Sequence, residues 1–269
     1  MNPLIRPFRT SVGSKYLVAL TGLALTLFVI AHLAGNLLVF AGKDAINSYA
    51  RKLEDLGTLL WAARAVLLVL FLLHVFVSLR LTMANSAARG TRYHHEGVLQ
   101  ASWASRHMWL TGLVLLAFIL FHLAHYTFGV VVPAKVQVDE SGKERKLDPP
   151  KNYLDLIEEK ILSAEGKRWE IRPEKNFSAI AHPTENQRRD VYSMMVNGFR
   201  TPWISITYLV SMAFLMLHLW HGGSSMFQSL GIPRKGLAGL VEWIGPVLGV
   251  ALALGNVAIV LGVWLGAVK

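Results

Sequence analysis

The chain has 269 residues, of which 53% are hydrophobic and only 16% are charged. Its apolar residues gather in long blocks, which excludes an ordinary water-soluble domain and indicates a protein that crosses a membrane several times. The formal net charge of +10 could suggest a nucleic-acid partner. In membrane proteins, however, basic residues usually mark topology and contacts with lipid headgroups, so no nucleic-acid partner is expected. The chain has no cysteine, so disulfides and cysteine-ligated clusters are excluded and any redox cofactor must be held by histidine.

Five apolar blocks are long enough, at about 20 residues or more, to cross a hydrocarbon core of roughly 30 Å as helices. They are about twice as long as barrel strands and lack the alternation of polar and apolar residues that such strands need. The predicted fold class is therefore all-α, a polytopic membrane protein with five transmembrane helices in one bundle. The blocks cover approximately residues 16–41, 59–83, 108–132, 203–229 and 237–268.

The basic N-terminal segment leads into an apolar block that is too long for a signal peptide and lacks a small-residue cleavage site, so we interpret the block as the first span. Lysine and arginine are concentrated in the short segments on one side, which predicts a cytoplasmic N-terminus and an outer C-terminus in a bacterial-type inner membrane. The basic side carries Arg6, Arg9, Lys15, Arg80, Arg89, Arg92, Arg106, Arg234 and Lys235, and the other side Lys43, Arg51, Lys52 and Lys269.

Residues 1–269 are predicted to form a single domain, in which residues 133–202 are a polar loop on the outer side between the third and fourth spans. Within this loop Leu154, Ile157, Ile161 and Leu162 recur at roughly helical spacing, which predicts a short surface helix. The rest of the loop has the composition of turns.

Each of the first four spans carries a histidine inside an apolar run, where a polar side chain is costly and usually functional. At 1.5 Å per residue, His32 lies roughly 24 Å and His122 about 21 Å above the cytoplasmic face. His74 and His218 each lie about 22 Å below the outer face. The four histidines therefore form two level pairs. His125 and His221 each lie three residues from a candidate, and spacing alone does not choose between such neighbours. We assign no role to His94, His95, His107 and His182.

Two pairs of histidines stacked along the membrane normal match the needs of two six-coordinate b-type hemes, since each iron takes one imidazole on either face. Such ligation blocks both axial positions and favours electron transfer over oxygen binding. The expected function is electron conduction across the membrane. The alternative is that these histidines only form hydrogen bonds to carbonyl groups of neighbouring helices.

The segments FVIAHLAGNLLVF, FLLHVFVSLR, TGLVLLAFILFHL and DVYSMMVNGF...HLWHGGSSMFQSLG resemble the cytochrome b subunit of succinate:quinone oxidoreductases, the succinate dehydrogenase and fumarate reductase family, in its diheme, five-helix, single-anchor type. The resemblance covers the four histidine-bearing spans in order, and the fifth span only as an apolar helix.

This resemblance selects His122, because the family's ligand follows a Thr-Gly pair by about three helical turns, and His218, because a glycine follows it by four positions. It implies that His32 and His122 hold the distal heme, and that His74 and His218 hold the proximal heme. Further contacts are implied at His125 and His221, and Arg80 is either a heme propionate partner or a topology anchor.

The resemblance implies a membrane anchor for a flavoprotein subunit and an iron–sulfur subunit on the cytoplasmic face. This chain would hold two heme b groups and exchange electrons with membrane quinone, so its part of the enzyme's activity is electron transfer and quinone reduction only.

For Arg64, within the outer turns of the second span, we favour snorkelling over a propionate contact. Glu242 is expected to be interfacial. Candidate quinone contacts are Asn36, Tyr49, Glu54 and Asp55, in a segment that is equally typical of an amphipathic interfacial helix.

Two alternatives are open. The first is the cytochrome b anchor of a formate dehydrogenase, hydrogenase or nitrate reductase, but such anchors concentrate their heme histidines on fewer helices. The second is a heme-free transporter or scaffold. Transporters usually have internal repeats or broken helices, whereas we find no convincing repeat beyond the recurring histidine and no break near the histidines of spans one to four.

Overall fold

The computed structural model describes residues 10–88, 103–128, 131, 135–138, 144–146, 159–162, 168–173, 191–232 and 236–268. This part of the chain contains five helices that are long and apolar enough to cross a membrane, which confirms the predicted polytopic helical fold. They cover Ser11–Ala41, Thr58–Ala87, Met108–Thr127, Pro202–Ser229 and Gly239–Trp264. The residues of the topology and histidine predictions that fall outside the described ranges are Arg6, Arg9, Arg89, Arg92, His94, His95, His182, Arg234, Lys235 and Lys269.

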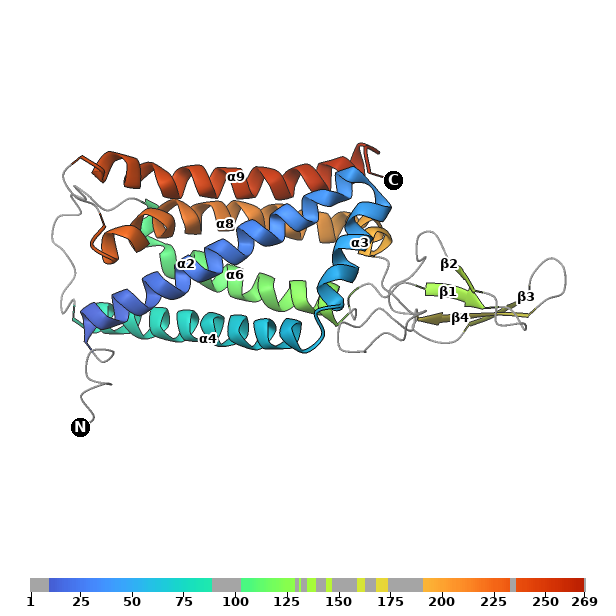
Figure 1. Ribbon diagram of the computed structural model, residues 1–269, viewed down its shortest axis with the longest axis horizontal. Coiled ribbons are helices and arrows are strands. Elements are labelled where there is room, and N and C mark those ends of the chain that lie inside the picture. Colours follow the sequence, from blue (N-terminus) through green and yellow to red (C-terminus); the bar gives the residue numbers. More distant parts are fainter. Residues whose placement is uncertain are drawn as a thin grey trace.

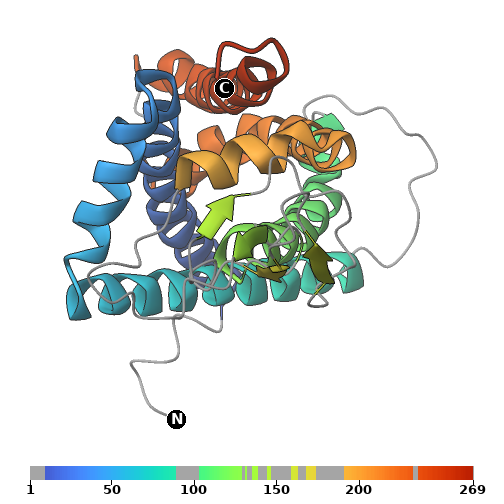
Figure 2. The same ribbon diagram turned by 90° about the vertical axis from the view of Figure 1, so that its right-hand side faces the viewer.

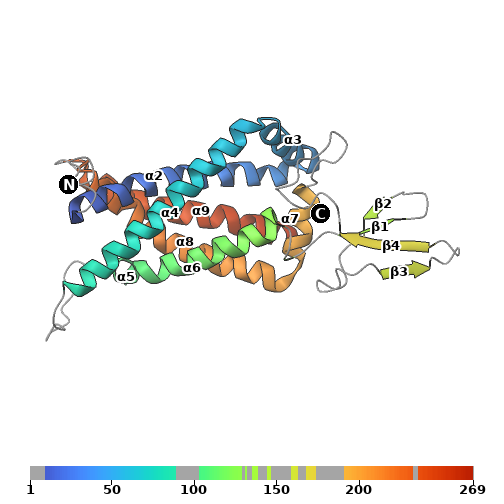
Figure 3. The same ribbon diagram turned by 90° about the horizontal axis from the view of Figure 1, so that it is seen from below.

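The helices form one bundle, which Figure 1 shows from the side and Figure 2 from one end. Helix α2 packs against both α4 and α8, α6 packs against α8, and α9 lies along α8. Figure 3 shows α4 crossing obliquely along the bundle. The long helices are α2 (Ser11–Asn36), α4 (Thr58–Ala87), α6 (Met108–His122), α8 (Pro202–Ser229) and α9 (Ala238–Trp264). The short helices are η1 (Leu37–Ala41), α3 (Lys43–Glu54), α5 (Trp103–Arg106), the π-helical turn η2 (Leu123–Thr127) and α7 (Val191–Arg200).

The helix limits follow from local chemistry. Helix α2 begins after Thr10, whose hydroxyl oxygen accepts a hydrogen bond from the Gly13 amide at 3.0 Å and so caps the first turn. Helix α8 begins at Pro202, a residue that suits the first helical position because it has no amide proton to leave unpaired. Gly42 and Gly57 flank α3 with φ angles of +100° and +51°, which other residues rarely adopt. These two glycines turn the chain out of the bundle and back into it.

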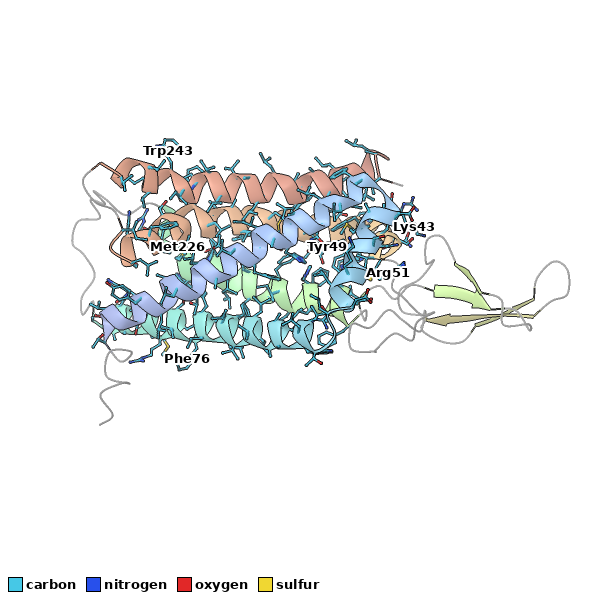
Figure 4. The ribbon with its side chains drawn as sticks, viewed as in Figure 1. Lys43, Tyr49, Arg51, Phe76, Met226 and Trp243 are labelled. Carbon is cyan, nitrogen blue, oxygen red and sulfur yellow. The ribbon has the colours of Figure 1, made fainter. Side chains whose placement is uncertain are left out.

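Helices α3 and α7 cover the end of the bundle at which α2 ends, which we call the outer end. The Tyr192 amide of α7 donates to the Asn47 side-chain oxygen of α3 at 3.0 Å, and Ile46 is buried. In Figure 4, Tyr49 lies on the side of α3 that faces the bundle, whereas Lys43 and Arg51 lie at its outer edge. The expected amphipathic helix is therefore present, with its apolar face on the bundle.

The connection between α6 and α8 contains a small antiparallel sheet instead of the predicted surface helix. Its strand order is β2-β1-β4-β3, and Ile161 pairs with Trp169 across its β3–β4 ladder. The helix prediction was wrong for residues 159–162, because antiparallel pairing with the next strand of the chain outweighs a short helical pattern; residues 151–158 lie outside the described ranges. Figure 1 shows the sheet beyond the outer end. The strands are β1 (Lys135–Val138), β2 (Glu144–Lys146), β3 (Glu159–Leu162) and β4 (Arg168–Pro173).

Helices α8 and α9 approach closely through glycines. A Cβ atom on Gly223 would lie 2.7 Å from the Cα atom of Gly245, so neither position has room for a side chain. Pro246 has no amide proton and leaves the carbonyl of Glu242 without its usual helical donor. The Ser224 hydroxyl donates to this carbonyl at 2.9 Å, and it accepts from the Gly245 amide at 3.2 Å. Helix α8 thus supplies the hydrogen bond that proline removes from α9.

Replacing Gly245 by valine is expected to destabilise the bundle by about 1–3 kcal/mol, because the new side chain would meet the backbone of α8. The measurement is the melting temperature of the detergent-solubilised protein. Gly239→Val on the same helix is the control, since in the described part of the chain no atom beyond its own helical turn lies within 4 Å of its Cβ position. Equal melting temperatures for the two variants would show that the close approach of α8 and α9 is not needed for stability.

Candidate functional site

The outer pair of histidines joins α2 to α6. The rings of His32 and His122 meet edge to face, with centroids 5.9 Å apart, and the His32 ring stacks on Phe28 at 5.4 Å. His32 is exposed although its ring faces another helix of the bundle. The protein's own side chains therefore do not enclose this imidazole.

One tyrosine of α8 connects two histidines at this level. The Tyr208 hydroxyl lies 3.1 Å from Nδ1 of His122 and 3.1 Å from Nδ1 of His125. The π-helical turn η2 contains His125, and its wider turn is closed by the Phe128 amide donating to the Leu123 carbonyl at 2.8 Å. This turn lets two histidines of one segment reach the same hydroxyl.

His125 is fully buried and packs against α7. Its ring stacks on Tyr126 at 4.0 Å, and a Cβ atom on Gly198 would lie 2.8 Å from its Cε1 atom. Among the residues that the structure describes, its Nε2 atom and the Tyr126 hydroxyl have no hydrogen-bond partner. The glycine of α7 is what allows this imidazole to fit.

The inner pair of histidines is held by threonines of the neighbouring helices. Nδ1 of His74 on α4 lies 3.0 Å from the Thr21 hydroxyl of α2. Nδ1 of His218 on α8 lies 3.1 Å from the Thr111 hydroxyl of α6. Thus α2 and α6 each carry one histidine of the outer pair and one threonine that contacts the inner pair.

Glycines follow both threonines. A Cβ atom on Gly22 would lie 3.3 Å from Cε1 of His74, and one on Gly112 would lie 3.6 Å from Cε1 of His218. Each imidazole therefore lies against a helix position that has no side chain. Ten residues separate Gly22 from His32, so the two levels are about 15 Å apart along α2.

An internal repeat accompanies this arrangement. The sequence Leu-Thr-Gly-Leu occurs at residues 20–23 and again at 110–113, and in both cases His-Leu-Ala follows ten residues after the glycine. This repeat was not among the sequence-based predictions, and neither were the contacts of Thr21 and Tyr208 with histidines. The repeated threonine was the signal that pointed to Thr21, whereas a lone tyrosine in α8 gave none.

The other candidate residues lie apart from the two pairs. Arg64 is exposed, and its guanidinium lies 5.0 Å from the ring centroid of Trp61, one turn nearer the outer end. This geometry fits snorkelling towards the interface. Arg80 and Glu242 are exposed near the inner end, opposite to α3, and His221 is half-buried one turn beyond His218. His107 precedes α6 and is the residue before its first turn.

The residues proposed for quinone contact are divided between two helices at the outer end. Asn36 ends α2, and Tyr49 of α3 packs on the adjacent Gly35, where a Cβ atom would collide with its ring. Glu54 is half-buried at the end of α3, and Asp55 is exposed. Tyr49 thus packs directly against the end of α2, next to Asn36.

No family model, no curated protein and no solved structure matches this chain.

Proposed function

We propose that the chain is the membrane-anchor diheme cytochrome b subunit of a succinate:quinone oxidoreductase. The observation that carries the proposal is the arrangement of the histidines. Four helices supply one each: two meet at the outer level, and each of the other two contacts a threonine one level further in, on one of the two helices that carry the outer pair. A pair of imidazoles from facing helices suits an iron whose other four ligands come from a porphyrin.

The residues present fit such a group at both levels. Nδ1 of His74, of His122 and of His218 is occupied by a hydroxyl of another helix, which is the kind of contact that metal-bound histidines usually make. At the outer level, His32 is not enclosed by protein side chains. At the inner level, glycine faces both rings. We infer that His32 and His122 hold the outer heme, and that His74 and His218 hold the inner one.

Bound heme b would supply one-electron chemistry at two depths of the membrane. The protein's part is to fix the four imidazoles and to keep water away through the surrounding apolar side chains. The aromatic residues Phe118, Tyr126 and Tyr208 pack around His122, which restricts the rotation of this ring. Because the pairs are stacked along α2, they support a path from one membrane face towards the other.

The proposed partners follow from this path. A flavoprotein subunit and an iron–sulfur subunit would bind the inner end, which the basic residues Lys15, Arg80 and Arg106 assign to the cytoplasm. Membrane quinone would be the substrate, and the bilayer of an inner membrane would surround the bundle. His125, His221 and Arg80 would contribute secondary contacts around the hemes.

The proposal is tested by the dithionite-reduced minus oxidised absorption spectrum of the purified complex, with heme quantified against protein. We expect two b hemes per chain in the wild type, and the loss of a different one in His32→Ala and in His74→Ala. The wild type without heme, or with one heme that neither substitution disturbs, would reject the proposal. Succinate-dependent quinone reduction by the complex would then separate this function from that of other respiratory anchors.

A further inference from the structure

Thr21 and Thr111 are buried polar residues in apolar helices, with exposed fractions of 3% and 0%. Each hydroxyl touches one histidine of the inner pair. A threonine hydroxyl has only one proton, so it donates to one partner and accepts from any other. The direction of these hydrogen bonds therefore decides which nitrogen of each imidazole carries a proton.

Each threonine hydroxyl donates its proton to a backbone carbonyl of its own helix. The Thr21 oxygen lies 2.7 Å from the carbonyl oxygen of Leu17, and the Thr111 oxygen lies 2.9 Å from that of Met108. Two oxygens at such distances need a proton between them, and only the hydroxyl has one to donate. The hydroxyl oxygen is then left as an acceptor towards the histidine.

The histidine must consequently donate from Nδ1. In a neutral imidazole a proton on Nδ1 leaves a lone pair on Nε2, across the ring from the hydroxyl. Both histidines of the inner pair therefore have the protonation pattern that leaves Nε2 free to bind a metal.

We propose that Thr21 and Thr111 are positioning residues for the inner heme: each hydroxyl accepts the Nδ1 proton of one axial histidine and so fixes its tautomer and its ring orientation. This inference rests on the proposed function. The internal repeat supports it independently, because a threonine precedes a glycine and an outer-level histidine at the same spacing in both α2 and α6.

The effect is specific to the inner level. A hydrogen bond from the Nδ1–H group to the threonine hydroxyl makes the imidazole a stronger electron donor to iron, which stabilises the ferric state. Neither threonine contacts the outer pair, in which His122 meets the Tyr208 hydroxyl instead. Removing one threonine hydroxyl should thus change the midpoint potential of the inner heme alone.

The test is a redox titration of the purified complex carrying Thr21→Val or Thr111→Val, which replace the hydroxyl by a methyl group. We expect each variant to keep two hemes and to shift the ferric-to-ferrous ratio of the inner heme about tenfold towards ferrous, equal to about +59 mV for one electron. Thr21→Ser and Thr111→Ser should restore the wild-type potential. The inner heme is identified as the one that His74→Ala removes.

Thr26→Val is the matched control, because Thr26 is also buried in α2 and its hydroxyl donates to the Gly22 carbonyl at 2.8 Å without touching a histidine. Unchanged potentials in both valine variants, an equal shift in Thr26→Val, or a failure of serine to restore the potential would each overturn the positioning role. These results leave the proposed function intact, whereas a wild-type complex without heme would reject the proposed function itself.

Discussion

A chain in which His32 and His218 are both replaced by alanine is expected to hold no b-type heme. These histidines belong to different pairs, so the double substitution removes one axial ligand from each site. A chain with His32 and His122 replaced loses two ligands of the same pair and is expected to keep one heme. The number of substitutions is equal in the two chains, and only the pairing of the helices differs.

The structure provides the reason for this contrast. His32 and His122 meet at 5.9 Å, whereas His218 is bound to Thr111 at the other level, about 15 Å away along the helix axis. Heme quantification of the purified complexes measures the outcome. The double variant His107→Ala, His182→Ala serves as the control and should keep two hemes, since the proposal assigns neither residue a role. Equal heme content in the His32/His218 and His32/His122 variants would refute the pairing.

Much of the bundle was predictable because a membrane imposes local rules. A span needs about 20 apolar residues wherever it occurs, so hydropathy alone located the five helices. A fixed rise per residue then converted the positions of His32, His74, His122 and His218 into depths. The structure brings together the two histidines that this calculation placed at the outer level.

The contacts around the histidines were less predictable, because they depend on how each helix is rotated about its axis. Thr21 and Thr26 are both threonines in the apolar sequence of α2, yet of these two only Thr21 contacts a histidine. The position of Tyr208 between two imidazoles results from the packing of α6 on α8, which no local pattern specifies. The sheet in the outer connection was missed for a related reason: the pairing of β1 with β4, which joins its two halves, connects segments far apart in the sequence.

Replacing Tyr208 by phenylalanine is expected to have the largest effect on stability of any single-atom change in the outer cluster. The Tyr208 hydroxyl has one proton and two histidine partners at 3.1 Å, so it donates to one and accepts from the other. If His122 binds iron through Nε2, its Nδ1 donates to Tyr208, and Tyr208 donates to Nδ1 of His125. Phenylalanine leaves both imidazoles without this partner, at a cost of about 1–3 kcal/mol for each.

The neighbouring Tyr126 offers a matched comparison within the same cluster. Its hydroxyl is buried, and in the described part of the chain it has no hydrogen-bond partner, so Tyr126→Phe removes a polar group that nothing in the described protein satisfies and should leave the melting temperature unchanged or higher. Tyr208→Phe should lower the melting temperature and change the spectrum of the outer heme. The two substitutions remove the same atom from the same residue type, so a difference between them reports the hydrogen bonds of Tyr208. If both variants melt alike, the tyrosine bridge is not what fixes His122 and His125 in the outer site.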